Sequence, residues 1–425
     1  MRKATYAVTK SKTERLLMDK ARLAAFNAVK RIFGGAYSNL IDFGDELSGL
    51  DRAFAESIAL GTSERKITLE FVLDDNVKSD TKRELYYLLM TGLYQILYMD
   101  RVPDSAACDE TVNIAKSIFG TKNAGFVNAV LRSICRRKND IIEKILNAEP
   151  YIKYSVNKSL FELIESQYPQ DAERIFDAFF KKSDMCLRIN NLKCKADDIA
   201  NQLNGYKLNE KAVVCSDPQK AIASIESGNY YVQGLASQKA VELLSAQSGQ
   251  TVIDVCACPG GKSLGVAIDM KNQGKVLSFD IHKNKLPLIQ KSAQRLGISI
   301  IETDVWDAKS TKADLIGIAD RVICDVPCSG TGVMGSKPEI KYKSPDEFKG
   351  LYPTQKAIIK SSSKYLKIGG MMVYSTCSIN KSENEAVVER FISENKGYKL
   401  ISQETCLPFG EEKEGFFMAK IVREF

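Results

Sequence analysis

Short runs of β-forming residues alternate with helical patterns from about residue 236 onward, and this alternation constrains the fold most. We predict strands at 251–255, 275–279, 299–302, 321–324 and 371–374. Strands separated by helices are typical of a mostly parallel sheet with helices on both faces. Ligands of such folds bind beyond the carboxyl ends of the strands, so a functional site is expected at that edge.

Two further regions precede this sheet. Up to about residue 140 the pattern is helical, with a central helix over 85–99 and a helix whose apolar face ends near Ile134. The cations of 135–138 at its end suit either a solvated helix terminus or a phosphate contact. Shorter helices and strands then follow to about residue 235. We therefore predict three domains: an all-α domain at 1–142, a small α+β domain at 143–235 and an α/β domain at 236–425.

Composition excludes several classes of protein. The 425 residues exceed one ordinary domain, and the net charge of +7 is compatible with nucleic acid without requiring it. The 11 cysteines show no disulfide-framework spacing, and there is neither a signal peptide nor an apolar run near 18 residues. We expect a cytoplasmic protein that does not enter the membrane. A single histidine, His282, excludes zinc sites with several histidine ligands, and we expect no metal.

The loop after the first predicted strand of the α/β region has the composition of a cofactor loop. Gly260 and Gly261 let the backbone approach a ligand, and the following helix offers its N-terminal amides. A phosphate-binding loop would need glycine where Cys256 stands, and the dinucleotide pattern G-x-G-x-x-G is absent. With phosphate-binding and dinucleotide-binding loops set aside, the remaining interpretation is a nucleoside cofactor without phosphate. Together with Asp280 at the end of the second strand, where an acid binds ribose hydroxyls, the loop indicates S-adenosylmethionine.

An acid after the third strand is a candidate to accept the adenine amino group. Asp304 and Asp307 both fit this place, and either can instead be a solvated loop carboxylate.

Two cysteines close neighbouring predicted strands. Cys328 lies in a Pro-Cys-Ser sequence after the fourth strand, and Cys377 lies in a Thr-Cys-Ser sequence after the fifth. A thiolate that adds to carbon 6 of cytosine makes carbon 5 nucleophilic, and a carboxyl group such as Asp325 can serve ring nitrogen 3. A second thiol can assist removal of the carbon 5 proton. The alternative is a pair of buried core cysteines, which we favour for the other cysteines of the chain.

These residues together resemble the RsmB (Sun) family of RNA cytosine-5 methyltransferases, whose target is cytidine 967 of 16S ribosomal RNA. The resemblance covers nearly the whole chain. Its motifs are the segments 259–262, 325–329 and 375–378, the segment 337–341 after the Pro-Cys loop, 36–40 of the helical front and 187–193 of the middle domain.

The resemblance implies a NusB-like helical domain, a small RRM-like α+β domain and a Rossmann-like methyltransferase domain that uses S-adenosylmethionine. It implies that Cys377 is the nucleophile, that Cys328 helps to release the product, and that Asp325 also acts in catalysis. The implied cofactor-binding residues are Cys256, Ala257, Cys258, Pro259, Gly260, Gly261, Lys262, Asp280, Asp307 and Asp325, with Asp304 in reserve for Asp307.

The sequence departs from the family at two places. Cys258 replaces an alanine, and Gly335–Ser336 replaces a pair that is often basic, which puts the exact RNA target in doubt. We expect a monomer that binds RNA, 16S ribosomal RNA in the first place, through its basic surface and helical domain. The alternatives are the same chemistry on another RNA such as transfer RNA, a non-catalytic NusB-like RNA-binding module, and a nucleotide-dependent oxidoreductase. The cysteine pair argues against the binding module, and the missing glycine pattern argues against the oxidoreductase.

Overall fold

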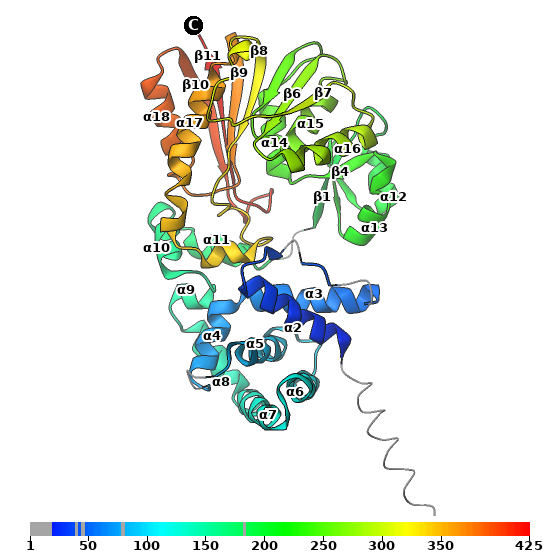
Figure 1. Cartoon of the computed structure of the whole chain (residues 1–425), viewed down its shortest axis with the longest axis vertical. Coiled ribbons are helices and arrows are strands. Elements are labelled where there is room, and N and C mark those ends of the chain that lie inside the picture. The colour runs from blue at the N-terminus through cyan, green and yellow to red at the C-terminus, as the bar shows by residue number, and fades with distance from the viewer. Residues whose placement is uncertain (1–18, 39–40, 44–46, 78–80, 182–183) are drawn as a thin grey trace, which may run out of the picture. The chain divides into compact units, whose positions relative to one another are not determined.

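Helices form the first part of the described chain because its apolar residues recur at helical spacing. The structure is a computed structural model and describes residues 19–38, 41–43, 47–77, 81–181 and 184–425 (Figure 1). Its contacts divide the chain into two units. The helical unit comprises Met1–Leu163 and Met334–Ser344, and the sheet unit comprises Ile164–Val333 and Pro345–Phe425.

The helical unit has α5 (Arg83–Tyr98) in its core, as predicted for the central helix. Leu88 and Leu93 of this helix are 1% and 0% exposed. Asp19 caps α2 (Lys20–Phe33) by accepting a backbone hydrogen bond, which satisfies one of the free amides of the first turn. Further described helices of this unit are α3 (Gly49–Glu64), α4 (Lys66–Asp74), α6 (Asp104–Phe119), α7 (Thr121–Arg136), α8 (Lys138–Leu146) and α9 (Pro150–Lys153).

Two cations at the end of α7 have protein partners. The Lys138 ammonium lies 2.9 Å from a carboxylate oxygen of Asp104, and Arg137 donates a hydrogen bond to the Asn76 side chain. For these two cations the structure favours a solvated helix terminus over a free phosphate site. In the segment 36–40, Asn39 and Leu40 lie outside the described residues.

The segment 337–341, which follows the Pro-Cys loop in the chain, belongs to the helical unit. Its 3-10 turn η5 (Pro338–Tyr342) packs against α3, and the Ser38 hydroxyl donates to a carboxylate oxygen of Glu339 at 2.7 Å. Lys341 is fully buried there, and burial lowers its pKa to about 7.

The small sheet of the sheet unit is antiparallel and has the order β2-β3-β1-β4. Its strands are β1 (Met185–Ile189), β2 (Tyr206–Asn209), β3 (Ala212–Cys215) and β4 (Tyr230–Val232). The helices near it in the chain are α10 (Lys158–Gln167), α11 (Ala172–Ala178), α12 (Ala196–Leu203) and α13 (Pro218–Ala223). The sequence analysis missed β2 because this strand is largely exposed and carries little apolar patterning.

The large sheet has seven strands in the order β10-β11-β9-β8-β5-β6-β7. The strands are β5 (Thr251–Asp254), β6 (Lys275–Asp280), β7 (Ile301–Val305), β8 (Ala319–Asp325), β9 (Leu366–Thr376), β10 (Tyr398–Cys406) and β11 (Phe416–Arg423). The five predicted strands form the parallel part, and β10 and β11, which were not predicted, are antiparallel. β7 begins two residues later than predicted, because the Ser299 amide bonds to the Asn272 side chain instead.

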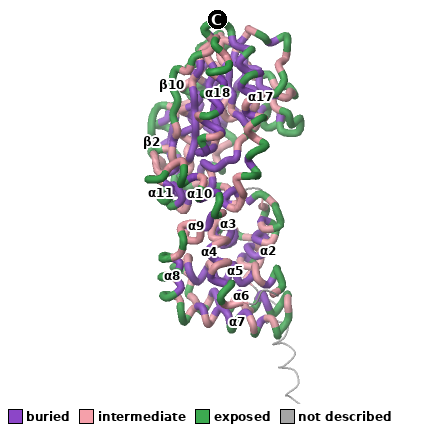
Figure 2. Tube along the Cα trace, turned by 90° about the vertical axis from the view of Figure 1, so that its left-hand side faces the viewer, coloured by how far each residue is buried: buried purple, intermediate pink, exposed green. Residues whose placement is uncertain are grey.

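Successive side chains of the large sheet enter two different cores. In β5, Val252 packs with α14 (Leu235–Leu244), α15 (Gly261–Asp269) and α16 (Leu286–Leu296), as the members of that core show. Its neighbour Ile253 packs on the other side, with α17 (Leu351–Ser363) and α18 (Glu385–Glu394). Figure 2 shows buried residues concentrated in the interior of the part of the chain that carries α17 and α18. The predicted mostly parallel sheet with helices on both faces is confirmed. Among the described residues, none of the helices combines the length and apolarity needed to cross a membrane.

Candidate active site

The predicted cofactor loop connects β5 to α15 at the carboxyl edge of the parallel strands. Two backbone hydrogen bonds hold it to the neighbouring strands: Val255 N–H donates to the Ile323 carbonyl at 3.1 Å, and Ala257 N–H to the Phe279 carbonyl at 2.7 Å. Gly260 has φ +109°, which favours glycine, and α15 begins at the next residue. The free amides of the first helical turn therefore lie beside a glycine turn, as an anionic or carboxylate-bearing ligand requires.

A buried acid at the end of β5 helps to hold this loop in place. Asp254 ends β5 and is 1% exposed; it accepts a hydrogen bond from the Ser263 hydroxyl at 2.6 Å. The Ser278 hydroxyl donates in turn to Ser263 at 2.9 Å, so the start of α15 is tied to both β5 and β6. Burial raises the pKa of Asp254 to about 7.

Asp280 lies at the end of β6, as predicted for the ribose-binding acid. Its carboxylate accepts the backbone N–H groups of Cys258 at 3.2 Å and His282 at 2.9 Å, which fix its orientation. The next side chain, Ile281, is 55% exposed and offers an apolar surface beside the acid. His282 itself is exposed in the loop that follows.

The two candidate acids near the end of β7 differ in position. Asp304 lies inside the strand, and its carboxylate lies 2.9 Å from the Lys312 ammonium. Asp307 lies two residues beyond the strand, where ligands of parallel sheets bind; its carboxylate lies 3.4 Å from the Lys309 ammonium.

The cysteines of the cofactor loop are protonated thiols. Burial raises the pKa of Cys256 well above its ordinary value. Burial and the charge of Asp280 raise the pKa of Cys258 to about 12. Neither sulfur is suited to act as a nucleophile, so these two residues can contribute only backbone groups and shape.

Cys328 and Cys377 come together at the carboxyl ends of β8 and β9. The two strands are parallel neighbours, with Asp325 opposite Ser375 in the register. The two sulfur atoms lie 3.2 Å apart. A hydrogen bond of 3.0 Å from the Gly332 amide to the Cys377 carbonyl joins the two loops near the sulfurs. The convergence predicted from the sequence is therefore present in the structure.

Asp325 forms an ion pair with the lysine of the cofactor loop. The Lys262 ammonium lies 2.7 Å from one carboxylate oxygen of Asp325, and the Ser375 hydroxyl donates to the other oxygen at 2.6 Å. Burial acts to lower the pKa of Lys262, but the charge and hydrogen bond of Asp325 outweigh it and raise that pKa, with a further contribution from Cys377. A cation thus lies near the Cys377 sulfur.

The two sulfurs have different electrostatic surroundings. The hydrogen bond to Cys377, followed by burial and by the charge of Glu383, raises the pKa of Cys328 well above its ordinary value. The Lys262 ammonium, by contrast, favours negative charge on Cys377. Of the two cysteines, Cys377 interacts electrostatically with a lysine, whereas Cys328 interacts electrostatically with an acid.

The sequence analysis missed Glu383, a fully buried acid behind the cysteine loops. Its carboxylate accepts hydrogen bonds from Ser329 and Ser378, the residues that follow the two cysteines. A buried carboxylate must be satisfied by several donors, but the sequence alone does not show which donors surround it.

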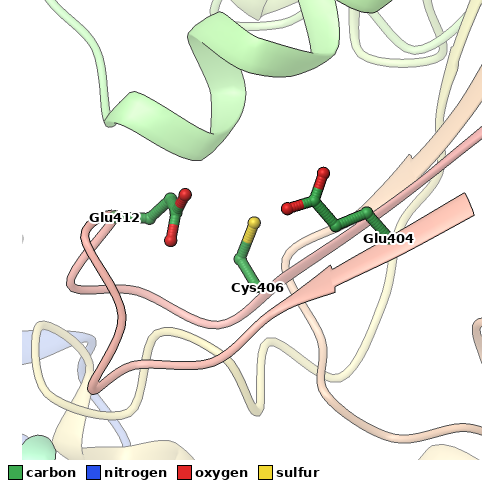
Figure 3. A group of neighbouring side chains, drawn as sticks. All are labelled: Glu404, Cys406 and Glu412. Atoms are coloured by element: carbon green, nitrogen blue, oxygen red, sulfur yellow. The ribbon is translucent and has the colours of Figure 1, made fainter.

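A group of potential metal ligands lies elsewhere in the sheet unit, at Glu404, Cys406 and Glu412 (Figure 3). The Lys239 ammonium is ion-paired with Glu412. Because a protein cation already neutralises this acid, the group is explained as an ion-pair cluster. Burial raises the pKa of Cys406 to about 12, so its sulfur is a protonated thiol.

Comparison with known proteins accounts for all three regions of the chain. The NusB family matches residues 19–136, an RsmF/B-like ferredoxin-like domain matches 158–219, and the 16S rRNA methyltransferase RsmB/F family matches 241–422. A probable ribosomal RNA small subunit methyltransferase B of Bacillus subtilis is 34% identical over 396 residues, which cover 88% of each chain. This chain belongs to the RsmB/F family. The predicted family, fold class and rRNA methyltransferase type are thereby confirmed.

Another relative agrees with this assignment, and two solved structures share the fold. A relative from Synechocystis, with the same name as the Bacillus protein, is 30% identical over 415 residues and covers 89% of this chain and 92% of its own. Among solved structures, PH0851 matches 96% of this chain and 99% of its own with a TM-score of 0.78 at 21% identity. NSun6 from Pyrococcus horikoshii, solved with SFG, matches 63% of this chain and 98% of its own with a TM-score of 0.56 at 20% identity. At these identities the two structures support the fold of this RsmB/F member.

Proposed function

We propose that this RsmB/F protein methylates carbon 5 of a cytosine in RNA, at cytidine 967 of 16S ribosomal RNA, with S-adenosylmethionine as methyl donor. The observation that carries the proposal is the pair of sulfurs, Cys328 and Cys377, 3.2 Å apart at the carboxyl edge of a methyltransferase sheet. Methylation at carbon 5 of cytosine needs a thiolate, whereas methylation of a ring nitrogen or an amino group does not.

The residues at this edge fit S-adenosylmethionine. Asp280 can accept the ribose hydroxyls, and the exposed Ile281 can pack on adenine. The amides at the start of α15 and the loop before it can hold the amino-acid end, and we keep Asp307 as the acid for the adenine amino group, with Asp304 in reserve. When bound, the cofactor supplies an electrophilic methyl group. The full proposed set is Cys256, Ala257, Cys258, Pro259, Gly260, Gly261, Lys262, Asp280, Asp307 and Asp325.

We assign the nucleophile to Cys377. Its thiolate, favoured by the nearby Lys262 ammonium, adds to carbon 6 of the cytosine, and the electron pair of the 5,6 double bond becomes available at carbon 5. Asp325 ends β8, three residues before Cys328, and is paired with Lys262, so a transferable proton is available at this pair to interact with ring nitrogen 3. The base must leave the stacked RNA for the sulfur to reach its face.

We assign product release to Cys328. After methyl transfer, the proton on carbon 5 leaves, its electron pair restores the 5,6 double bond, and the bonding pair between carbon 6 and sulfur returns to Cys377. Cys328 passes its thiol proton to the departing Cys377 sulfur, 3.2 Å away, and its own sulfur takes up the carbon 5 proton, so that both cysteines end as thiols.

Bisulfite sequencing tests the proposed reaction, because 5-methylcytosine resists conversion. Unmethylated 16S ribosomal RNA and unmodified transfer RNA are each incubated with the protein and S-adenosylmethionine. We expect protection of one cytosine in 16S RNA, at position 967, and none with the Cys377→Ala variant. Protection of a cytosine in transfer RNA alone would show that the same reaction acts on another RNA. Methyl incorporation without any protected cytosine would contradict the proposal.

Several further expectations remain proposals about this protein. We propose that it acts as a cytoplasmic monomer and binds RNA through its basic surface and the helical domain. We also keep the division into 1–142, 143–235 and 236–425. Size-exclusion chromatography with light scattering tests the monomer, and RNA binding by a variant with charge reversals on the helical domain tests the RNA-binding surface.

A further inference from the structure

Glu383 lies behind the two cysteine loops, fully buried, and four donors converge on its carboxylate. One oxygen accepts the Ser329 backbone N–H at 2.8 Å and the Gln355 side-chain amide at 2.9 Å. The other accepts the Ser329 hydroxyl at 2.5 Å and the Ser378 hydroxyl at 2.7 Å. A carboxylate with this many donors is held in one orientation.

The donors hold the Cys328 loop on both sides of the cysteine. Ser329, directly after Cys328, is bound by Glu383 through its backbone amide and its hydroxyl. Pro327, directly before Cys328, accepts a hydrogen bond of 3.0 Å from the same Gln355 amide that binds Glu383. The backbone around the sulfur therefore has little freedom to move.

The same carboxylate holds the Cys377 loop. Ser378, directly after Cys377, donates to Glu383 and also shares a 2.8 Å contact with the Thr331 hydroxyl of the Cys328 loop. Glu383 is itself anchored to β9, since the Tyr374 hydroxyl donates to its backbone carbonyl at 2.6 Å. One side chain thus joins the ends of two strands 49 residues apart in sequence, as measured between the two cysteines.

We propose that Glu383 is a positioning residue for the cysteine pair, which holds the Cys328 and Cys377 sulfurs in contact by binding Ser329 and Ser378. This inference rests on the proposed function for its catalytic consequence, but the positioning itself can be measured without catalysis. In this role Glu383 contacts neither the thiol protons nor the substrate. It acts through its hydrogen bonds to the two loops.

Only an acceptor at this place satisfies both loops. The Ser329 amide can donate but not accept, so removal of the carboxylate leaves a buried donor unpaired. Glutamine can replace Glu383 with modest loss: its carbonyl accepts the two amides, and its NH₂ group donates to hydroxyls that can rotate. Alanine cannot do this, and the cavity it leaves allows the two loops to separate.

The experiment measures the distance between the sulfurs through their cross-linking rate. Diamide removes one hydrogen from each of two neighbouring thiols, so that a disulfide forms and the diamide is reduced to the hydrazine. Peptide mass spectrometry follows the Cys328–Cys377 disulfide over time in the wild type, Glu383→Ala and Glu383→Gln. Cys108 and Cys135 in the helical unit, with sulfurs 3.4 Å apart, give an internal control in every sample.

We expect Glu383→Ala to slow the Cys328–Cys377 cross-link by about tenfold or more and leave the Cys108–Cys135 rate unchanged. Glu383→Gln should stay within about threefold of the wild type. In the methyl-transfer assay, kcat of Glu383→Ala should fall by about 100-fold while KM for S-adenosylmethionine changes by less than about twofold. Glu385→Ala is the matched control and should behave like the wild type. Glu385 lies two residues after Glu383, and its carboxylate accepts a hydrogen bond from the Thr405 hydroxyl.

An unchanged cross-linking rate in Glu383→Ala would overturn the positioning role, as would an equal loss in Glu385→Ala. Should Glu383→Ala not fold, Ser378→Ala removes one of the four hydrogen bonds and should slow cross-linking by a smaller factor; an unchanged rate there would equally overturn it. If wild-type protein cross-links as expected but methylates no cytosine, the proposed function fails and the positioning role stands.

Discussion

The helical unit and the sheet unit each bring two cysteine sulfurs into contact. Cys108 on α6 and Cys135 on α7 have sulfurs 3.4 Å apart, and Cys328 and Cys377 at the ends of β8 and β9 have sulfurs 3.2 Å apart. The two distances are nearly equal, so proximity alone does not distinguish a reactive pair from a packed one.

The surroundings of the two pairs differ. Cys108 lies in the apolar core of the helical unit, and burial raises its pKa to about 12. The nearby Arg132 is exposed and has its own partner, the Asp109 carboxylate at 2.6 Å. In the sheet unit, the partly buried Lys262 is ion-paired with Asp325, and the buried acid Glu383 accepts hydrogen bonds from the Cys328 loop. Ionisable groups held near a sulfur pair, rather than the pair itself, mark the candidate active site.

The largest effect should come from removing one sulfur of each pair in turn. Cys377→Ala should lower methyl transfer by about a thousandfold or more, because the step then lacks its nucleophile. Cys135→Ala should leave turnover within about twofold. Methyl transfer is measured with labelled S-adenosylmethionine, and cofactor binding by calorimetry, which Cys377→Ala should leave intact. Retained turnover in Cys377→Ala would remove the distinction between the pairs.

Loss of the second sulfur should stop the reaction at a different point. Cys328→Ala should form a covalent complex with RNA that survives a denaturing gel, because the carbon 5 proton lacks its base and the bond to Cys377 persists. The matched Cys108→Ala variant should form none. Absence of the complex with an RNA that the wild type methylates would contradict the role of Cys328 in release.

Burial of a titratable group in the sheet unit should also show in how the free energy of unfolding depends on pH. Folded Asp254 keeps its proton up to about pH 7, whereas an unfolded aspartate loses it near pH 3.8. Between these values the folded state binds more protons, so the free energy of unfolding falls as pH rises. Asp254→Asn should therefore gain on the wild type between pH 5 and pH 8, by at most about 2.7 kcal/mol, since about two pH units separate pH 5 from the pKa of the folded state. Urea unfolding at both pH values measures this.

An exposed acid of the same sheet provides the control for that measurement. The Lys312 hydrogen bond lowers the pKa of Asp304, and this side chain is exposed on β7, so Asp304→Asn should show no such gain. A wild type and an Asp254→Asn variant whose stabilities run parallel from pH 5 to pH 8 would show that burial of Asp254 carries no charge penalty.

A smaller effect is expected at the cofactor edge of the sheet. Asp280→Ala should weaken S-adenosylmethionine binding by about 10- to 100-fold, the cost of hydrogen bonds to a charged group, and leave RNA binding within about twofold. Calorimetry gives the first value and a filter-binding assay the second. A larger loss of RNA binding than of cofactor binding would misplace the pocket.

The smallest effect is expected for the single histidine. His282 is exposed, and only its backbone N–H binds Asp280, so His282→Gln should keep kcat and KM within about twofold. A bell-shaped pH profile that lost one limb in His282→Gln would instead show that this imidazole takes part in proton transfer.

Much of the site could be predicted because the ends of buried strands can be recognised in a sequence. The strands that carry Asp280, Asp325 and Cys377 are apolar runs, and parallel strands bring their carboxyl ends to one edge. The contact between Cys328 and Cys377 follows from two neighbouring strands of this kind.

The supporting residues could not be predicted in the same way. Glu383 and Gln355 lie outside the strands. They contact the cysteine loops through hydrogen bonds that depend on the folded conformation of those loops, which the sequence pattern does not show. The pairing of Lys262 with Asp325 likewise joins the start of α15 to the end of β8, 63 residues apart in the sequence. The antiparallel strands β10 and β11 lie outside the alternation of strands and helices on which the prediction depended, and β10 is mostly exposed.

The identity of the sulfur that bonds to cytosine tests the central claim most directly. Cys328→Ala is incubated with 16S ribosomal RNA and S-adenosylmethionine, digested with nuclease and protease, and sequenced by tandem mass spectrometry. We predict one methylated cytidine attached to the peptide that contains Cys377. A nucleotide on Cys108, Cys135 or any other cysteine, or a methylated RNA with every cysteine unmodified, would contradict the account.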